Sequence, residues 1–183
     1  YYSVGGGFLL REGEVPQEGK TVPYRYRDFE SFRRLTEKYG MTPETIILEN
    51  EAALSELSPE KIRKRLAAII DAMCDAVRRG LSASGVLPGP IRLSRRAGEV
   101  YRRAMSPETD DARFLLLLDA FALAAAEENA AGHLVVTAPT SGSAGLLPGI
   151  VYFLRGIRGV RMEKLVDGML IAGLIAMIAR RNA

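Results

Sequence analysis

Three short triplets of a hydroxyl residue, proline and glutamate constrain the fold of this chain more than any other feature. They begin at Thr42, Ser58 and Ser106. In each triplet the hydroxyl can cap a helix, the proline fits the first helical position, and the acid complements the helix dipole. After Ser58, apolar residues recur at spacings of three and four over residues 62–77, and Gly80 is expected to end that helix. The sequence predicts a mainly α fold, a helical bundle without a parallel sheet.

Two longer segments are expected to form further helices. One runs from about Ser106 to Ala131, and its small residues ALAAA predict the close approach of another helix. The other runs from Met162 to Arg181 and is apolar on nearly all sides. It is short for a bilayer and Asp167 interrupts it, so a central helix of a bundle is predicted. Residues 85–97 contain two prolines and two glycines and are interpreted as a rigid connector.

The N-terminal residues have a different character. The stretches YYSVGGGFLLREGE and TVPYRYRDF combine aromatic and β-branched residues on either side of a link that contains glycine and proline. This pattern predicts two short strands, and therefore a short β-hairpin. We expect a hairpin or junction segment at residues 1–27 and a helical domain at residues 28–183, incomplete at its C-terminus. Both ends of the chain look cut, so a fragment or one piece of a processed protein is expected.

A single cysteine, Cys74, and a single histidine, His133, limit the possible sites. They cannot form a closed zinc site, which takes about four nitrogen or sulfur ligands, and a lone cysteine excludes an internal disulfide. Cys74 lies on the apolar face of its helical segment, so a buried structural thiol is expected. The lone thiol fits a cytoplasmic protein. The net charge of +3 does not indicate a nucleic-acid or membrane partner.

The stretch TAPTSGSAGLLPG, residues 137–149, is the candidate ligand-binding loop. It has two interpretations, an ordinary turn or a loop that brings N–H groups and hydroxyls to an anion at a helix start near Ala144. The second would use three hydroxyl donors and two glycines that leave room for the ligand: Thr140, Ser141, Ser143, Gly142 and Gly145. The spacing is not that of a P-loop. Glu128 and Asn129, at the end of the preceding helix, are either satisfied structural groups or members of the site.

Four stretches together carry a resemblance: YYSVGGGF, GVLPGPIRLSRRA, EENAAG and TAPTSGSAGLLPG. In this order and spacing they resemble the iron–sulfur-dependent L-serine dehydratases of bacteria, from end to end of the chain. The resemblance implies the helical catalytic (alpha) domain of an enzyme that converts L-serine to pyruvate and ammonia. It implies a four-iron–four-sulfur cluster with one open iron acting as Lewis acid, and no pyridoxal phosphate. It places residues 128–132 in the family's ENAAG segment and residues 137–145 in the loop beside substrate and cluster, and it implies that Glu128, Asn129, Thr140, Ser141, Gly142 and Ser143 bind the substrate.

The chain departs from the family at the cluster. Where the family commonly has Gly-x-Cys-Gly with a ligand cysteine, this sequence has Gly142-Ser143-Ala144-Gly145, so Ala144 occupies the ligand position. Cys74 matches no ligand position, and the family's other cysteines fall beyond residue 183. Three explanations stay open: a homologue that lost the cluster, an engineered Cys→Ala change, or ligands from an absent segment. We favour the first, and we expect the isolated chain to hold no cluster.

The partner expected from this resemblance is a small amino-acid substrate. A missing C-terminal segment or partner chain and a homo- or hetero-oligomer are also expected, and no nucleic acid or membrane. Catalytic residues are not assigned. Two rival functions are a structural or regulatory subunit that keeps only the fold, and a nucleic-acid module. The nucleic-acid module ranks last because Tyr101 is the one aromatic residue near its arginines, whereas nucleic-acid surfaces combine several of both. These arginines are Arg92, Arg95, Arg96, Arg102 and Arg103.

Overall fold

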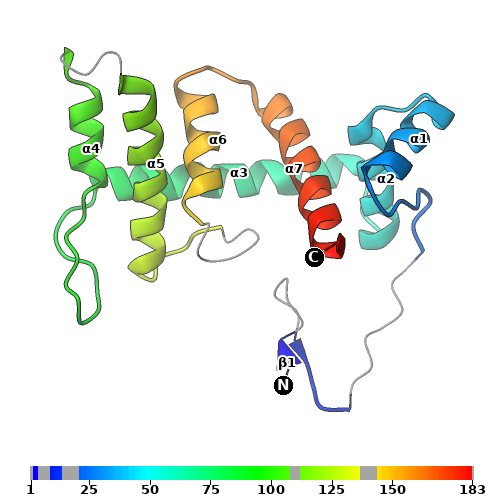
Figure 1. The fold of residues 1–183 in the computed structure, drawn as a ribbon, viewed down its shortest axis with the longest axis horizontal. Coiled ribbons are helices and arrows are strands. Elements are labelled where there is room, and N and C mark those ends of the chain that lie inside the picture. Colours follow the sequence, from blue (N-terminus) through cyan, green and yellow to red (C-terminus); the bar gives the residue numbers. More distant parts are fainter. Residues whose placement is uncertain (1, 4–8, 14–20, 108–111, 137–143, 183) are drawn as a thin grey trace. The chain divides into compact units, whose positions relative to one another are not determined.

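The computed structural model describes residues 2–3, 9–13, 21–107, 112–136 and 144–182. Within these residues the chain is mainly helical, which confirms the predicted fold class (Figure 1). The elements, in chain order, are β1 (Tyr2–Ser3), β2 (Leu9–Leu10), α1 (Phe29–Tyr39), α2 (Pro43–Ser55), α3 (Pro59–Ser82), α4 (Ala97–Ala104), α5 (Arg113–Ala130), α6 (Leu146–Gly156) and α7 (Met162–Asn182). They belong to two compact units, one of Tyr1–Lys64 with Asp167–Ala183 and the other of Arg65–Val166.

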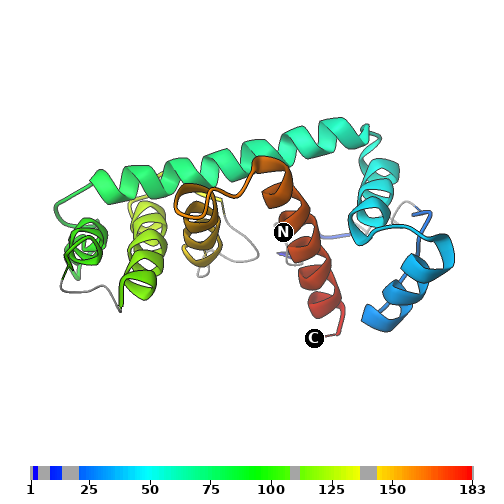
Figure 2. The same ribbon diagram turned by 90° about the horizontal axis from the view of Figure 1, so that it is seen from above.

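In the second unit, helices α4, α5 and α6 lie side by side across the C-terminal half of α3 (Figures 1 and 2). The centre of this unit is Phe121 of α5, which is fully buried and stacks edge-on against Tyr152 of α6 with ring centroids 4.8 Å apart. Val77 of α3 and Leu117 of α5 belong to the same buried cluster. Burying such apolar side chains is the main stabilising term of the unit.

Small residues set the spacing of these helices. A methyl group on Gly80 of α3 would lie 2.2 Å from the carbonyl oxygen of Ala124 in α5. On α6, a methyl group on Gly149 would lie 2.9 Å from the backbone nitrogen of Ala122. The expectation that the ALAAA segment admits another helix is therefore confirmed on two sides. Gly80 does not end its helix as predicted, because α3 continues to Ser82.

Two of the three predicted helix starts are confirmed. Thr42 caps α2 by accepting a hydrogen bond from the backbone nitrogen of Thr45, and Ser58 does the same for Lys61 at the start of α3. The third start is wrong, since α5 begins at Arg113 and not at Ser106. Helix α4 occupies residues that the sequence did not identify as helical.

In the first unit, the segment of residues 21–27 is attached to α2 by the side chain of Asn50. The amide of Asn50 donates to the carbonyl oxygen of Tyr24 at 2.7 Å and accepts from the Tyr24 nitrogen at 2.9 Å. Residues 21–27 form no strand, so the predicted second strand is misplaced. The strand pair instead closes earlier, between β1 and β2, which pair antiparallel.

Helix α7 buries one stripe of its surface. Leu170, Leu174 and Ile178 are buried at a spacing of four, whereas Ile175 and Met177 are about half exposed. The prediction of a central helix of a bundle is therefore wrong for the described residues, because part of this apolar surface is exposed. No helix in the described part of the chain combines the length and apolar character that crossing a membrane requires.

Candidate amino-acid site

The C-terminal end of α5 carries a buried carboxylate, that of Glu128, which is 1% exposed. Its Oε1 accepts a hydrogen bond from Arg95 Nη1 at 3.0 Å, and its Oε2 accepts from Arg79 Nε at 3.1 Å. The ring nitrogen Nδ1 of His133 lies 2.9 Å from the same Oε2. Three side chains thus converge on one carboxylate, which provides the partners that a buried charge requires.

Three elements deliver these partners. Arg79 comes from α3, Arg95 from the connector before α4, and His133 from the segment after α5. The turn at Gly132, whose φ is +76°, redirects the chain so that the His133 nitrogen donates to the carbonyl oxygen of Glu128 at 3.0 Å. Arg79 Nη2 donates to the carbonyl oxygen of Leu134 at 2.6 Å. The backbone that leads toward residue 137 is therefore fixed to both α3 and α5.

The environment keeps Glu128 ionised. Burial raises the pKa of its carboxyl, but hydrogen bonds from His133, Arg79 and Arg95 outweigh burial and leave the pKa below its ordinary value. The Glu128 carboxylate faces two guanidinium groups, which are always charged. This group of side chains, called the Glu128 cluster below, therefore has an excess of positive charge. Such an excess favours a nearby anion, including the carboxylate of an amino acid.

The neighbouring Glu127 has a structural role. Its Oε1 accepts hydrogen bonds from the backbone nitrogens of Arg96 at 2.6 Å and Ala97 at 3.1 Å, which caps the start of α4. The side chain is buried, and its Oε2 has no partner among the residues that the structure describes. The two consecutive glutamates therefore fix different elements, α4 and the Glu128 cluster.

The loop residues predicted to bind substrate, Thr140, Ser141, Gly142 and Ser143, lie outside the described residues. Asn129 follows Glu128 and is half-buried. Ala144 is buried, and α6 begins at Leu146 rather than at Ala144. A methyl group on Gly145 would lie 2.4 Å from the carbonyl oxygen of Ala122, so this glycine admits helix α5. The expected ligand space at Gly145 is therefore filled by protein.

The residues of this chain do not fit an iron–sulfur cluster. Within the described residues, no group of three or more histidine, cysteine or acidic side chains is placed to hold a metal ion. The chain has one cysteine, Cys74, which is buried on α3 at 3.8 Å from Arg155 Nη1. Burial raises the pKa of its thiol, and the neighbouring arginines only partly offset this. Since cluster ligation uses several thiolates, this buried thiol provides no such site.

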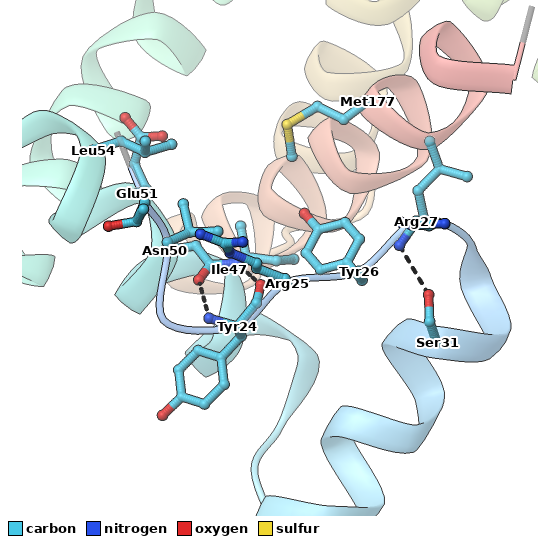
Figure 3. Close-up of a pocket in the computed structure, with 13 residues that line it drawn as sticks. Tyr24, Arg25, Tyr26, Arg27, Ser31, Ile47, Asn50, Glu51, Leu54 and Met177 are labelled. Atoms are coloured by element: carbon cyan, nitrogen blue, oxygen red, sulfur yellow. Dashed lines mark hydrogen bonds between the residues drawn. The ribbon is translucent and has the colours of Figure 1, made fainter. Parts of the chain in front are cut away.

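A separate pocket of about 950 Å³ lies in the first unit (Figure 3). Residues 21–27, α2 and the end of α7 line it, and Figure 3 shows Asn50 reaching the backbone of Tyr24 at its wall. Its lining mixes apolar groups such as Ile47 and Met177 with Arg25. Neither Glu128 nor Asn129, the two described residues that were predicted to bind substrate, lines it.

The profile of the family described as "Serine dehydratase alpha chain" matches residues 38–183. The chain belongs to the serine dehydratase alpha chain family. It is 36% identical over 190 residues to "L-serine dehydratase 2" of Escherichia coli, 37% over 191 residues to "L-serine dehydratase" of Haemophilus influenzae, and 35% over 189 residues to that of Streptomyces coelicolor. Each match covers 100% of this chain and 41% of the relative. The chain thus spans less than half the length of these serine dehydratases.

Sequence reasoning identified Glu128 but missed its partners. The sequence indicates only that a buried acid needs hydrogen-bond donors, and this does not identify Arg79 or His133 as the donors. Arg95 was considered only for a nucleic-acid surface. Its side chain is 8% exposed and is bonded to Glu128, so this arginine is not available to such a surface.

Proposed function

We propose that this chain is part of an L-serine ammonia-lyase, which converts L-serine to pyruvate and ammonia. The observation that carries the proposal is the buried, ionised Glu128 with Arg79, Arg95 and His133, located directly before the loop that resembles the family's substrate loop. The similarity over the whole chain to proteins named L-serine dehydratase supports it.

In this proposal the chain provides the amino-acid-binding part of the site. Thr140, Ser141 and Ser143 offer hydroxyl donors to the substrate carboxylate, and Gly142 leaves space for it. The positive excess around Glu128 attracts the same carboxylate. Because Glu128 is buried and its oxygens already accept three hydrogen bonds, it acts by holding its neighbours in place.

The cluster that the family implies requires ligands from outside this chain. In place of the cluster loss that the sequence favoured, we propose that the ligand cysteines lie in the part of the relatives' length that this chain does not span, on a C-terminal segment or partner chain. The oligomer predicted from the sequence is part of the same proposal. No step of the reaction is assigned to the cluster here, because the residues of this chain do not fit it.

A non-catalytic subunit that keeps only the fold is the second candidate. The observation that favours it is the residue at the family's cluster-ligand position. This residue is Ala144, which cannot bind iron and is buried in the protein interior. This candidate predicts a protein without iron, sulfide or lyase activity.

One experiment separates the two candidates. The intact protein is purified without oxygen, its iron and sulfide are quantified, and pyruvate formation from L-serine is measured, with D-serine as the control substrate. Pyruvate formed only from L-serine supports the lyase. Absence of pyruvate from a folded protein that contains a full cluster contradicts the lyase, and absence of pyruvate, iron and sulfide supports the non-catalytic subunit.

A further inference from the structure

We propose that His133 is the proton acceptor of this site, with Glu128 as the group that orients it. The inference rests on the proposed function, since it assigns the residue that removes the α-proton of L-serine. His133 is the single histidine of the chain, and its side chain is 55% exposed beside a carboxylate that is 1% exposed. An exposed imidazole fixed by a buried carboxylate is an arrangement that positions a general base.

The hydrogen-bond geometry determines the tautomer. An ionised carboxylate can only accept, so the contact of 2.9 Å between Nδ1 and Glu128 Oε2 requires the proton on Nδ1. In the neutral ring, Nε2 then carries the lone pair. Nε2 lies on the opposite side of the ring from Nδ1, and within the described residues it forms no hydrogen bond. The nitrogen that can accept a proton is therefore the one that has no partner among the described residues.

The surrounding groups hold this arrangement. Arg79 and Arg95 keep Glu128 ionised, so it continues to accept from Nδ1. The backbone nitrogen of His133 donates to the carbonyl oxygen of Glu128, so the main chain and the ring are both bound to one residue. Arg79 also holds the carbonyl oxygen of Leu134, the next residue. The imidazole is thus positioned by three contacts before any ligand arrives, which is the condition for efficient proton transfer.

The reaction step balances with this one group. Nε2 takes the proton from Cα, and the electron pair of that C–H bond forms the Cα=Cβ double bond. The Cβ–O bond breaks, and the leaving hydroxide takes the proton back from the imidazolium. The products are water and 2-aminoacrylate, which hydrolyses to pyruvate and ammonia. The substrate class is an amino acid with a leaving group on Cβ.

The test uses His133→Ala and the control Leu115→Ala in the intact protein. Leu115 lies on α5, is 62% exposed, and is not among the residues that hold Glu128 or His133, so shortening its side chain leaves their contacts in place. We expect His133→Ala to lower kcat roughly 100-fold or more with little change in KM, and added imidazole to restore part of the rate. A kcat for His133→Ala within threefold of the unaltered protein overturns the inference while the lyase function stands.

Two further measurements cover the remaining outcomes. If the unaltered protein forms no pyruvate, loss of deuterium from α-deuterated L-serine is followed by NMR. Loss that depends on His133 supports the inference although the lyase function fails, and no loss overturns both. Nitrogen-15 NMR of the histidine ring, assigned with His133→Gln, gives the tautomer directly without relying on the folding of His133→Ala. A proton on Nε2 in the neutral ring overturns the inference.

Discussion

Gly80 provides the sharpest test of how α3 packs against α5. A methyl group there would lie 2.2, 2.6 and 2.7 Å from the O, C and Cα atoms of Ala124, all backbone atoms that cannot rotate away. Overpacking of a core costs about 1–3 kcal/mol, and rigid backbone places Gly80→Ala at the upper end of that range. Replacing a helical glycine with alanine returns about 1 kcal/mol through helix propensity. We therefore expect Gly80→Ala to lower the free energy of unfolding by about 2 kcal/mol.

The matched control is Gly173→Ala in α7. This glycine is also inside a helix, but a methyl group would meet nothing within 4 Å. Only the propensity gain remains, so this variant is expected to be more stable by about 1 kcal/mol. Urea denaturation followed by circular dichroism measures both variants. Equal stability of Gly80→Ala and the unaltered chain would show that α3 and α5 are not in contact at this point, and the packing described above would be wrong.

Three further variants or treatments test other parts of the structure. Glu128→Gln should lower the free energy of unfolding by about 3 kcal/mol, because it leaves guanidinium groups without their buried partner. The pKa of the Glu128 carboxyl is lower in the folded chain than its ordinary value. The ionised carboxylate therefore stabilises the fold above the ordinary pKa, and this stabilisation is lost as the pH falls through the folded-state pKa. Acid titration should therefore destabilise the unaltered chain more than Glu128→Gln. Asn50→Ala removes both hydrogen bonds to Tyr24 and should cost about 1–3 kcal/mol, with faster hydrogen exchange at the Tyr24 amide; an unchanged rate there contradicts the attachment. Burial raises the pKa of the Cys74 thiol, so iodoacetamide should label it only after denaturation, and rapid labelling of the folded protein would show that it is accessible.

The helices that sequence could predict are those with local signals. Helix α2 begins with Thr42 and Pro43, whose capping contact lies within three residues, so the start can be read from neighbouring letters. Helix α5 begins at Arg113 after Ala112, which offers no side-chain cap. Helix α4 is capped by Glu127, located 30 residues beyond Ala97. A cap supplied from so far along the chain has no local pattern, which explains why α4 was missed.

The same distinction applies to glycines and to the candidate site. Gly80 was expected to end a helix because glycine is common at helix C-termini. In the structure, glycine is needed at this position because the backbone of Ala124 in α5 leaves no room for a side chain, and only the fold brings Ala124 near. Glu128 could be identified as a buried acid from the small residues around it. Its partners Arg79 and Arg95 are 49 and 33 residues away in sequence, so their identity depends on tertiary structure. The sequence could therefore predict one member of the site, Glu128, but not the side chains that bind to it.

The end of α5 couples the fold of the second unit to the candidate site. Glu127 holds the start of α4, while Glu128 holds Arg95 in the connector directly before that helix. A displacement of the connector would therefore disturb both carboxylates together, and with them the position of His133. Loss of activity in a variant of Arg95 can then arise through stability as well as through proton transfer. Imidazole rescue separates the two causes, because free imidazole can replace a missing base but cannot restore a displaced connector. This is why the assignment of His133 depends on rescue and tautomer measurements rather than on loss of activity alone.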